Sequence, residues 1–210
     1  MALPGSASWV LKKIWGCRDL LDRDPMCKQL FFATGGYSIR KMYLCLLGQF
    51  PKVQWRRVVC NNFASPKSLF ILWLAVHGRL PTKDRLMQWG IVTDGVCSLC
   101  GVDPESVQHM FFQCSYARQV WQKFLQILNI NRSSQAFDQE LQFAMRMSKK
   151  CTAVSKLLLA GFAEAVYSLW IQRNQRVFAG HIQSAEQIVK EIVFKVACRC
   201  RDSDIVLLLY

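Results

Sequence analysis

Residues 97–114 read CSLCGVDPESVQHMFFQC and place three cysteines and one histidine within eighteen positions. Two residues separate Cys97 from Cys100, eight separate Cys100 from His109, and four separate His109 from Cys114. Zn²⁺ is held tetrahedrally by thiolate and imidazole ligands, and two cysteines at this spacing can turn toward one ion. Because protein side chains fill all four positions, the pattern predicts a structural zinc site that stabilises the fold and does not catalyse.

The residues around this motif predict a turn followed by a helical stretch. Asp94-Gly95 precedes the first cysteine pair and Gly101 follows it, which favours a tight knuckle whose backbone amides face the sulfurs. The apolar residues of 106–114 recur at helical spacing. Residues about one turn apart share a helix face, so the step from His109 to Cys114 requires a small distortion or a helix end between them.

Two other interpretations of these cysteines are open. Free cysteine is among the most buried residue types, so the motif could instead be part of a reduced core with His109 as an ordinary, partly buried histidine. A disulfide framework fits less well, because ten cysteines in 210 residues are a lower density than that of a small secreted scaffold. The cysteines outside the motif are also scattered and odd in number, and we expect a reducing compartment.

The predicted fold class is mainly α: a helical module with one zinc knuckle. Ser65 is predicted to cap one helix with Pro66 at its first position, and Thr82 to cap a short helix that ends at Gly90. In the longest predicted helix Phe178 is expected to face inward, and Arg173 to reach solvent together with Arg176. Apolar periodicity predicts the helices over 7–23, 40–49, 53–62, 66–77, 117–128, 137–148, 152–178 and 184–200.

A small β-hairpin is also predicted near the N-terminus. Residues 29–33 and 37–39 have strand-like composition and flank Thr34-Gly35-Gly36, which favours a tight turn. We divide the chain into three parts on this basis. Residues 1–52 form a basic N-terminal segment with the hairpin, residues 53–128 form the zinc-binding domain, and residues 136–203 form a C-terminal helical segment.

The composition is that of a protein with a packed core, since 52% of its residues are hydrophobic and 12% aromatic. The longest uninterrupted apolar run, Leu69–Val76, is too short to cross a bilayer, which takes about 20 residues. The N-terminus lacks the order of charged and apolar regions that a signal peptide has. We therefore expect location in the nucleus or cytoplasm without membrane association, and the apolar stretch 205–210 suggests a piece of a larger chain.

The charge is strongly basic, with a formal net charge of +13. Residues 1–60 hold ten Lys or Arg against three Asp, whereas residues 61–130 hold six against four acidic residues. A basic surface is expected to meet polyanions, with RNA or DNA the leading candidate, and cations mixed with tryptophans are typical of strand-binding surfaces. The alternative is a set of amphipathic helices with Trp inward and cations outward. The candidate nucleic-acid-binding residues are Lys12, Lys13, Lys52, Arg56 and Arg57.

The sequence contains no motif that predicts catalysis. Polymerisation and RNA hydrolysis through two metal ions need clustered carboxylates, yet the fourteen acidic residues include no adjacent Asp pair and are mostly spread over predicted helix surfaces. A phosphate-binding glycine loop, a G-x-S-x-G nucleophile elbow and an H-E-x-x-H zinc motif are absent. His77 and His181 are placed as cap or surface residues. We expect no enzymatic activity and no small-molecule substrate.

Residues 55–124 resemble the reverse transcriptase zinc-binding domain of plant LINE-type (non-LTR) retrotransposons. Residues 37–43 resemble the segment that usually precedes this domain, and residues 170–178 resemble the helical tail that usually follows it. The order and spacing of the matching landmarks carry the resemblance; they are Pro66-Lys67, Phe70, Trp73-Leu74, Gly78-Arg79-Leu80-Pro81-Thr82, Leu86, Gly90, Cys97, Cys100, Glu105, His109, Phe111, Cys114 and Trp121.

The resemblance implies a module that lies downstream of an RNA-directed DNA polymerase and contacts template nucleic acid. It implies Cys97, Cys100, His109 and Cys114 as the metal ligands. The paired aspartates of the polymerase have no counterpart here, nor has a ribonuclease H site. Two functions follow: a zinc-binding module that contacts RNA or DNA through a basic face, or a scaffold that docks the polymerase domain or another partner. A non-functional retroelement relic is a third, and it predicts poor folding even with zinc.

Overall fold

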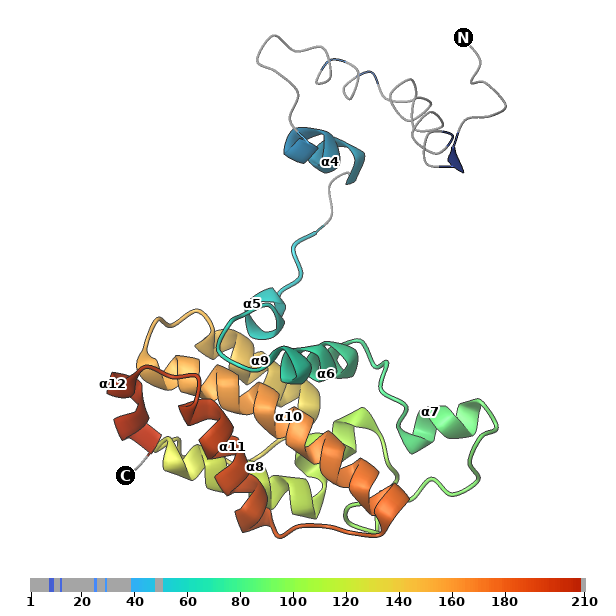
Figure 1. Ribbon diagram of the computed structural model, residues 1–210. Coiled ribbons are helices and arrows are strands. Elements are labelled where there is room, and N and C mark those ends of the chain that lie inside the picture. The colour runs from blue at the N-terminus through green and yellow to red at the C-terminus, as the bar shows by residue number, and fades with distance from the viewer. Residues whose placement is uncertain are drawn as a thin grey trace. The chain divides into compact units, whose positions relative to one another are not determined.

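The computed structural model describes residues 8, 9, 12, 25, 29, 39–47 and 51–208. The chain divides into two compact units, residues 1–52 and residues 53–210. The first unit contains helix α4 (Ile39–Leu47). The second unit (Figure 1) contains α5 (Arg56–Val59), α6 (Pro66–Val76), α7 (Lys83–Gln88), the π-helix η1 (His109–Gln113), α8 (Ser115–Ile127), α9 (Phe137–Met147), α10 (Ala153–Ala179), α11 (Ala185–Ala197), α12 (Asp202–Ile205) and the 3₁₀ turn η2 (Val206–Leu208).

The prediction of a mainly helical protein is confirmed, but the β-hairpin near the N-terminus is not supported. Ile39 begins α4, and the described residues contain no strand. Residues 30–38, which hold most of the predicted hairpin, lie outside the described residues, as does most of the helix predicted over 7–23. Ile39, the last residue of the predicted second strand, is instead the first residue of a helix with apolar residues at helical spacing.

Helix α10 forms the centre of the second unit (Figure 1). It packs against α6, α8, α9 and α11. Thr152 caps its start by accepting the N–H of Ser155 at 3.2 Å, and it ends at Gly180, whose φ of 66° is the left-handed conformation that closes helices. By length and composition α10 could cross a membrane, but 78% of its most apolar window is buried inside the protein. That burial is what a core helix requires.

An aromatic cluster joins α10 to three other elements. The ring of Phe162 on α10 lies 5.4 Å from that of Phe112 on η1, and Phe112 in turn lies 5.3 Å from Trp121 on α8 and 6.1 Å from Phe137 on α9. All four side chains are at most 1% exposed. Burial of aromatic rings is the largest single contribution per residue to a core. The segments predicted as 53–128 and 136–203 therefore contribute to one continuous core.

The last two turns of α10 differ from the sequence prediction. Phe178 is 82% exposed, because the helix from Gln175 onward extends beyond the helices that cover its middle. Arg173 is only 4% exposed, since its guanidinium pairs with a buried carboxylate, whereas Arg176 is exposed as predicted. Periodicity alone could not show where the covering helices end.

Buried carboxylates connect the helices at two other positions. Glu164 on α10 accepts the backbone N–H of Ser65 at 2.9 Å and the hydroxyl of Ser68 at 2.7 Å, at the start of α6. Glu140 on α9 accepts the indole N–H of Trp121 at 2.9 Å and also binds Arg132. Acidic residues predicted to be spread over helix surfaces thus include side chains that are 0–1% exposed. Such groups persist in a core only when they are hydrogen-bonded.

Replacing Gly161 by alanine is expected to destabilise the protein. A Cβ atom at this position of α10 would lie 2.0 Å from Cε1 and Cζ of the fully buried Phe124 ring on α8. Overpacking costs about 1–3 kcal/mol, and the better helix propensity of alanine returns about 1 kcal/mol. An approach of 2.0 Å is far inside van der Waals contact and belongs at the upper end of the overpacking range, so we expect Gly161→Ala to lower the free energy of unfolding by about 2 kcal/mol in urea denaturation. In a Phe124→Leu background the same substitution should cost less, and an equal cost in both backgrounds would contradict this contact.

Candidate metal centre

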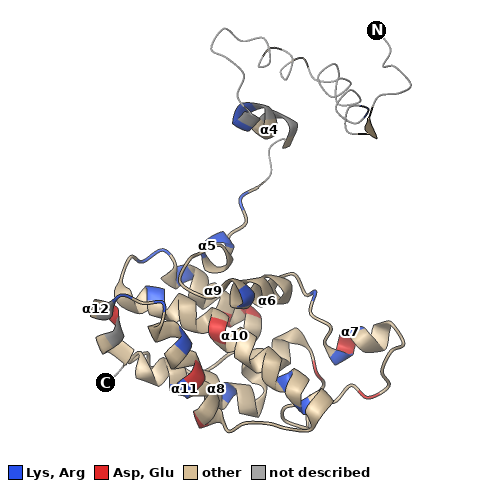
Figure 2. Cartoon of the chain, viewed as in Figure 1, with Lys and Arg blue, Asp and Glu red and all other residues tan. Residues whose placement is uncertain are grey.

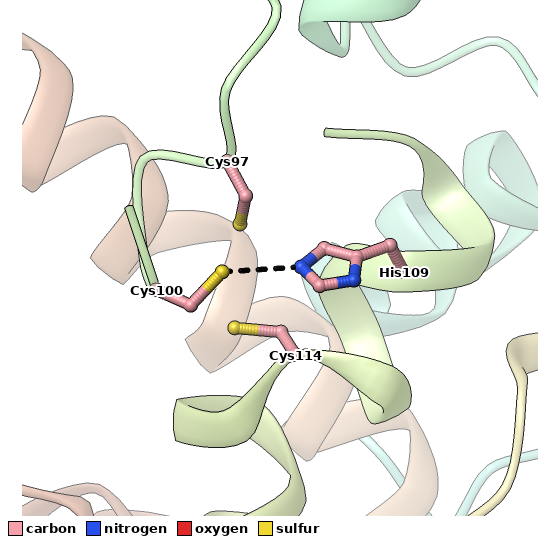
Figure 3. Close-up of side chains that lie close together, drawn as sticks. All are labelled: Cys97, Cys100, His109 and Cys114. Carbon is pink, nitrogen blue, oxygen red and sulfur yellow. Dashed lines mark hydrogen bonds between the residues drawn. The ribbon is translucent and has the colours of Figure 1, made fainter. Parts of the chain in front are cut away.

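The first cysteine pair lies on a tight knuckle (Figure 3). The N–H of Cys97 donates to the carbonyl of Asp103 at 2.7 Å, and the N–H of Gly101 donates to the carbonyl of Cys97 at 2.8 Å. Gly101 has a φ of 69°, a conformation that residues with a side chain rarely adopt. An isolated bridge between Val96 and Pro104 closes the base of the knuckle. The turn residues that the sequence offered therefore build the knuckle.

The second pair of donors lies at the two ends of a π-helical turn. The N–H of Cys114 donates to the carbonyl of His109 at 2.7 Å, which is a hydrogen bond between residues five apart. An ordinary α-helical turn spans 3.6 residues, so a π-turn accommodates one residue more and brings positions i and i+5 to the same face. This is the distortion that the sequence spacing required.

The four side chains converge on one point. Their donor atoms all lie within 4.8 Å of one another, and the Sγ of Cys100 is 3.3 Å from Nε2 of His109. Figure 3 shows the three sulfurs and the imidazole pointing toward one another. In a tetrahedral zinc site the donor atoms lie about 3.5–3.8 Å apart. Displacements of about 1 Å or less would therefore close this set around one ion.

The electrostatic environment favours a neutral imidazole and shifts the pKa values of the two buried thiols in opposite directions. Burial lowers the pKa of His109, which favours the neutral ring that a metal requires, although Asp103 and Glu105 oppose this effect. The thiol of Cys97 donates to the sulfur of Cys114, which raises the pKa of Cys97 and lowers that of Cys114. The backbone amides of Cys100 and Leu99 act in the opposite direction on Cys97, as expected of a knuckle.

Asp103 lies near the imidazole on the side away from the sulfurs. Its Oδ2 lies 3.8 Å from Nδ1 of His109, while Nε2 of the same ring faces Cys100. Metal-binding histidines commonly direct their second nitrogen to a carboxylate, which fixes the tautomer and the ring orientation. The sequence analysis did not identify Asp103 in this role, and its position between the ligands was the available signal.

Glu105 holds the knuckle against the rest of the fold. Its Oε1 accepts the guanidinium of Arg173 at 2.7 and 3.0 Å and the backbone N–H of Lys83 at 3.0 Å, and its Oε2 accepts the N–H of Ser98 at 3.3 Å. Glu105 is 0% exposed. One carboxylate therefore connects the knuckle, the start of α7 and the end of α10. Sequence reasoning marked Glu105 only as a family landmark and missed its partner Arg173.

The metal cluster is also joined to the aromatic core. Phe111 and Phe112 occupy the π-turn between His109 and Cys114, and both side chains are 0% exposed. The two rings pack against Phe137 with centroid distances of 5.5 and 6.1 Å. The two core rings lie between two ligands in one short segment, so the geometry of the cluster and the packing of the core depend on each other.

The candidate nucleic-acid-binding residues lie on other parts of the chain. Arg56 and Arg57 begin α5 and are exposed, and Lys12 and Lys52 are exposed as well. Lys13 lies outside the described residues. Cys198 and Cys200 are not part of a metal-binding group among the residues that the structure describes. Figure 2 shows that Lys and Arg are spread over several helices of the second unit.

Comparison with known proteins identifies one family. Residues 37–121 match the family described as zinc-binding in reverse transcriptase, which includes all four residues of the cluster but less than half of the chain. No curated protein and no protein of solved structure matches the chain significantly. The match concerns the zinc-binding family as a whole. The plant, LINE-type origin stays a prediction.

Proposed function

We propose that this chain, whose residues 37–121 match the zinc-binding family of reverse transcriptases, binds one structural zinc ion and contacts RNA or DNA. The observation that carries the zinc assignment is the convergence of three sulfurs and one imidazole nitrogen within 4.8 Å. When bound, zinc supplies the cross-link between the knuckle and the π-turn, held by Cys97, Cys100, His109 and Cys114. Elemental analysis of protein purified without added metal tests this assignment, with one zinc per chain expected.

Nucleic acid as the partner is supported by charge and by family. The net charge of +13 favours polyanions, and the matched family accompanies an enzyme that acts on nucleic acid templates. Arg56 and Arg57 are exposed and make no ion pair in the described part of the chain. Exposed cations without an ion-pair partner can displace counterions from the phosphate backbone, and this release is a main source of affinity in protein–nucleic acid complexes.

A non-catalytic role is part of the same proposal. The buried carboxylates Glu105, Glu140 and Glu164 are all engaged in hydrogen bonds that hold helices and turns together. Carboxylates for two-metal chemistry instead lie close together around an accessible site. These bonds support a role in folding, and we propose that polymerase activity, if the chain takes part in it, resides in a separate domain.

Neutralising four of the predicted nucleic-acid-binding residues should weaken nucleic acid binding in a salt-dependent manner. We expect a variant in which Gln replaces Lys12, Lys13, Arg56 and Arg57 together to bind single-stranded RNA or DNA with lower affinity than the wild type. The slope of log K against log salt should fall by up to about 3, since each phosphate contact contributes about 0.7 for single strands. Fluorescence anisotropy at several salt concentrations measures both quantities.

A charge-matched variant distinguishes these four residues from bulk charge. An equal decrease of the slope in both variants would show that these residues have no special part in binding, and absence of binding by the wild type would refute the nucleic acid proposal altogether. The control replaces four exposed cations of the second unit by Gln, none of which forms an ion pair with a residue that the structure describes; they are Arg146, Lys149, Lys150 and Lys190.

Exposed apolar side chains around the knuckle favour a second candidate function, the docking of a protein partner. Trp89 is 53% exposed, Ile91 64% and Val102 76%. Such side chains on a surface are associated with protein interfaces. If a polymerase domain is the partner, the isolated protein should self-associate and added polymerase domain should suppress this, which sedimentation velocity can measure. A monomeric protein that ignores the polymerase domain would exclude this function.

A further inference from the structure

The segment that contains α5 and α6 has an extreme charge composition. No Asp or Glu occurs between Asp24 and Asp84, whereas nine Lys or Arg occur there: Lys28, Arg40, Lys41, Lys52, Arg56, Arg57, Lys67, Arg79 and Lys83. Within the second unit, α5 and α6 pack against each other. The residues of these two helices therefore contribute Lys and Arg side chains to their shared surface and no acidic side chains.

Aromatic side chains form a continuous row along this surface, which we call the aromatic stripe: Phe70 and Trp73 of α6, His77 directly after α6, and Trp55 before α5. The rings of Phe70 and Trp73 lie 6.2 Å apart with an interplanar angle of 15°. His77 lies 4.4 Å from Trp73 and 5.1 Å from Trp55. Residues three and four apart share a helix face, so the row follows the axis of α6.

The stripe faces away from the core. Phe70 is 57% exposed and His77 is exposed. Trp55 and Trp73 are partly buried and pack against the core with part of their surface. Leu72 and Ala75 of α6 are 0% and 2% exposed, since α6 packs on α10. The Nδ1–H of His77 donates to the carbonyl of Trp73 at 2.8 Å, which fixes the orientation of the imidazole ring. The rings are thus held in place by the fold and are accessible to solvent on one side.

Cations border the stripe without being paired. The guanidinium of Arg79 lies 5.4 Å from the centre of the Trp73 ring, and Lys67 is exposed near the start of α6. Neither forms an ion pair with any residue that the structure describes. The acidic side chain beneath α6 is Glu164, which is 1% exposed and bonded to Ser65 and Ser68. It therefore does not present a negative charge to a ligand on the stripe.

We propose that the aromatic stripe is a base-stacking platform for single-stranded RNA or DNA. Surfaces that bind single strands combine aromatic rings, on which bases stack, with cations that track the phosphates. In a duplex the bases are stacked on each other and their faces are not available, so the stripe should prefer single strands. This inference rests on the proposed function, because it assigns the nucleic acid contact to a particular surface and a particular form of nucleic acid.

The test compares Phe70→Ala with a matched control, Phe194→Ala. Both are exposed phenylalanines on helices, at 57% and 69%, and Phe194 belongs to α11. The probes are a single-stranded oligonucleotide, its duplex and an abasic strand of the same length, each titrated with zinc-loaded full-length protein in fluorescence anisotropy. Loss of one base–ring stack corresponds to about 5- to 150-fold in affinity.

We expect Phe70→Ala to lower affinity for the single strand by about 10-fold, with an unchanged salt slope and unchanged affinity for the abasic strand. Phe194→Ala should behave as the wild type. Equal loss on the abasic strand, or equal behaviour of the two variants, would overturn the stacking platform while the wild type still binds nucleic acid. If the wild type binds none of the probes, the proposed function itself fails, and the two failures are therefore distinguishable.

Discussion

Removal of the metal is expected to abolish the cooperative unfolding of residues 53–210. Structural zinc contributes roughly 10–16 kcal/mol of apparent binding free energy in zinc-finger peptides at neutral pH, which is comparable to or greater than the whole stability of an ordinary domain, about 5–15 kcal/mol. Phe111 and Phe112 lie between two of the ligands, so release of the ion frees core side chains as well. We expect the chelator-treated protein and a Cys97→Ser, Cys100→Ser variant to lose the sharp thermal transition measured by circular dichroism.

Two exposed cysteines outside the cluster provide the control. Cys151 and Cys198 are exposed and free, so a Cys151→Ser, Cys198→Ser variant should retain one zinc per chain and the transition of the wild type. A metal-free wild type with an equally sharp transition would show that the cluster is a reduced core. A protein that stays unfolded with zinc would instead agree with a retroelement relic.

Replacement of Arg173 by alanine should be the most damaging single substitution away from the cluster. Arg173 is 5% exposed at its side chain and Glu105 is 0% exposed, with 2.7 Å between Nη2 and Oε1. Removing one partner of a buried ion pair leaves an uncompensated charge and costs about 3–5 kcal/mol. Because Glu105 also binds the backbone of the knuckle, we expect Arg173→Ala to lower both the free energy of unfolding in urea and the affinity for zinc.

Arg176→Ala is the matched control on the same helix. Arg176 is exposed and donates to the carbonyl of Gly180 at 3.1 Å, so its loss should change stability by about 0.5 kcal/mol or less. The double variant Arg173→Ala, Glu105→Gln removes both charges and should be more stable than Arg173→Ala. A double variant as unstable as the single one would mean that packing of the arginine, and not the unpaired charge, accounts for the loss.

Local chemistry made the metal cluster and most helices predictable. The ligand spacing and the turn residues near Cys97 are encoded within eighteen residues, and the structure brings the four side chains together. The start of α6 follows the same logic, since the hydroxyl of Ser65 accepts the N–H of Ser68 at 3.1 Å with Pro66 at the first position. Interactions between neighbours in the chain leave a pattern that the sequence displays.

Interactions between distant residues left no such pattern. Arg173 and Glu105 are 68 residues apart, and nothing near either residue indicates that the other neutralises it. Helix α5 is also shorter than the predicted 53–62, because the side chain of Asn61 accepts the N–H of Phe63 at 2.9 Å and donates to the carbonyl of Val58. Asparagine competes with helical hydrogen bonds in this way, and only the folded arrangement decides which wins.

The π-turn makes chain length, and not side-chain identity, the constraint between the last two ligands. Gln113 is exposed and could change to many residues without cost. Insertion of one residue beside it would be different in kind, because the two ligands would then be six positions apart, and neither an α-turn nor a π-turn brings positions i and i+6 to one face. The segment could then keep Phe111 and Phe112 in the core or keep both ligands on the ion. Substitutions are therefore tolerated where a single-residue insertion is not.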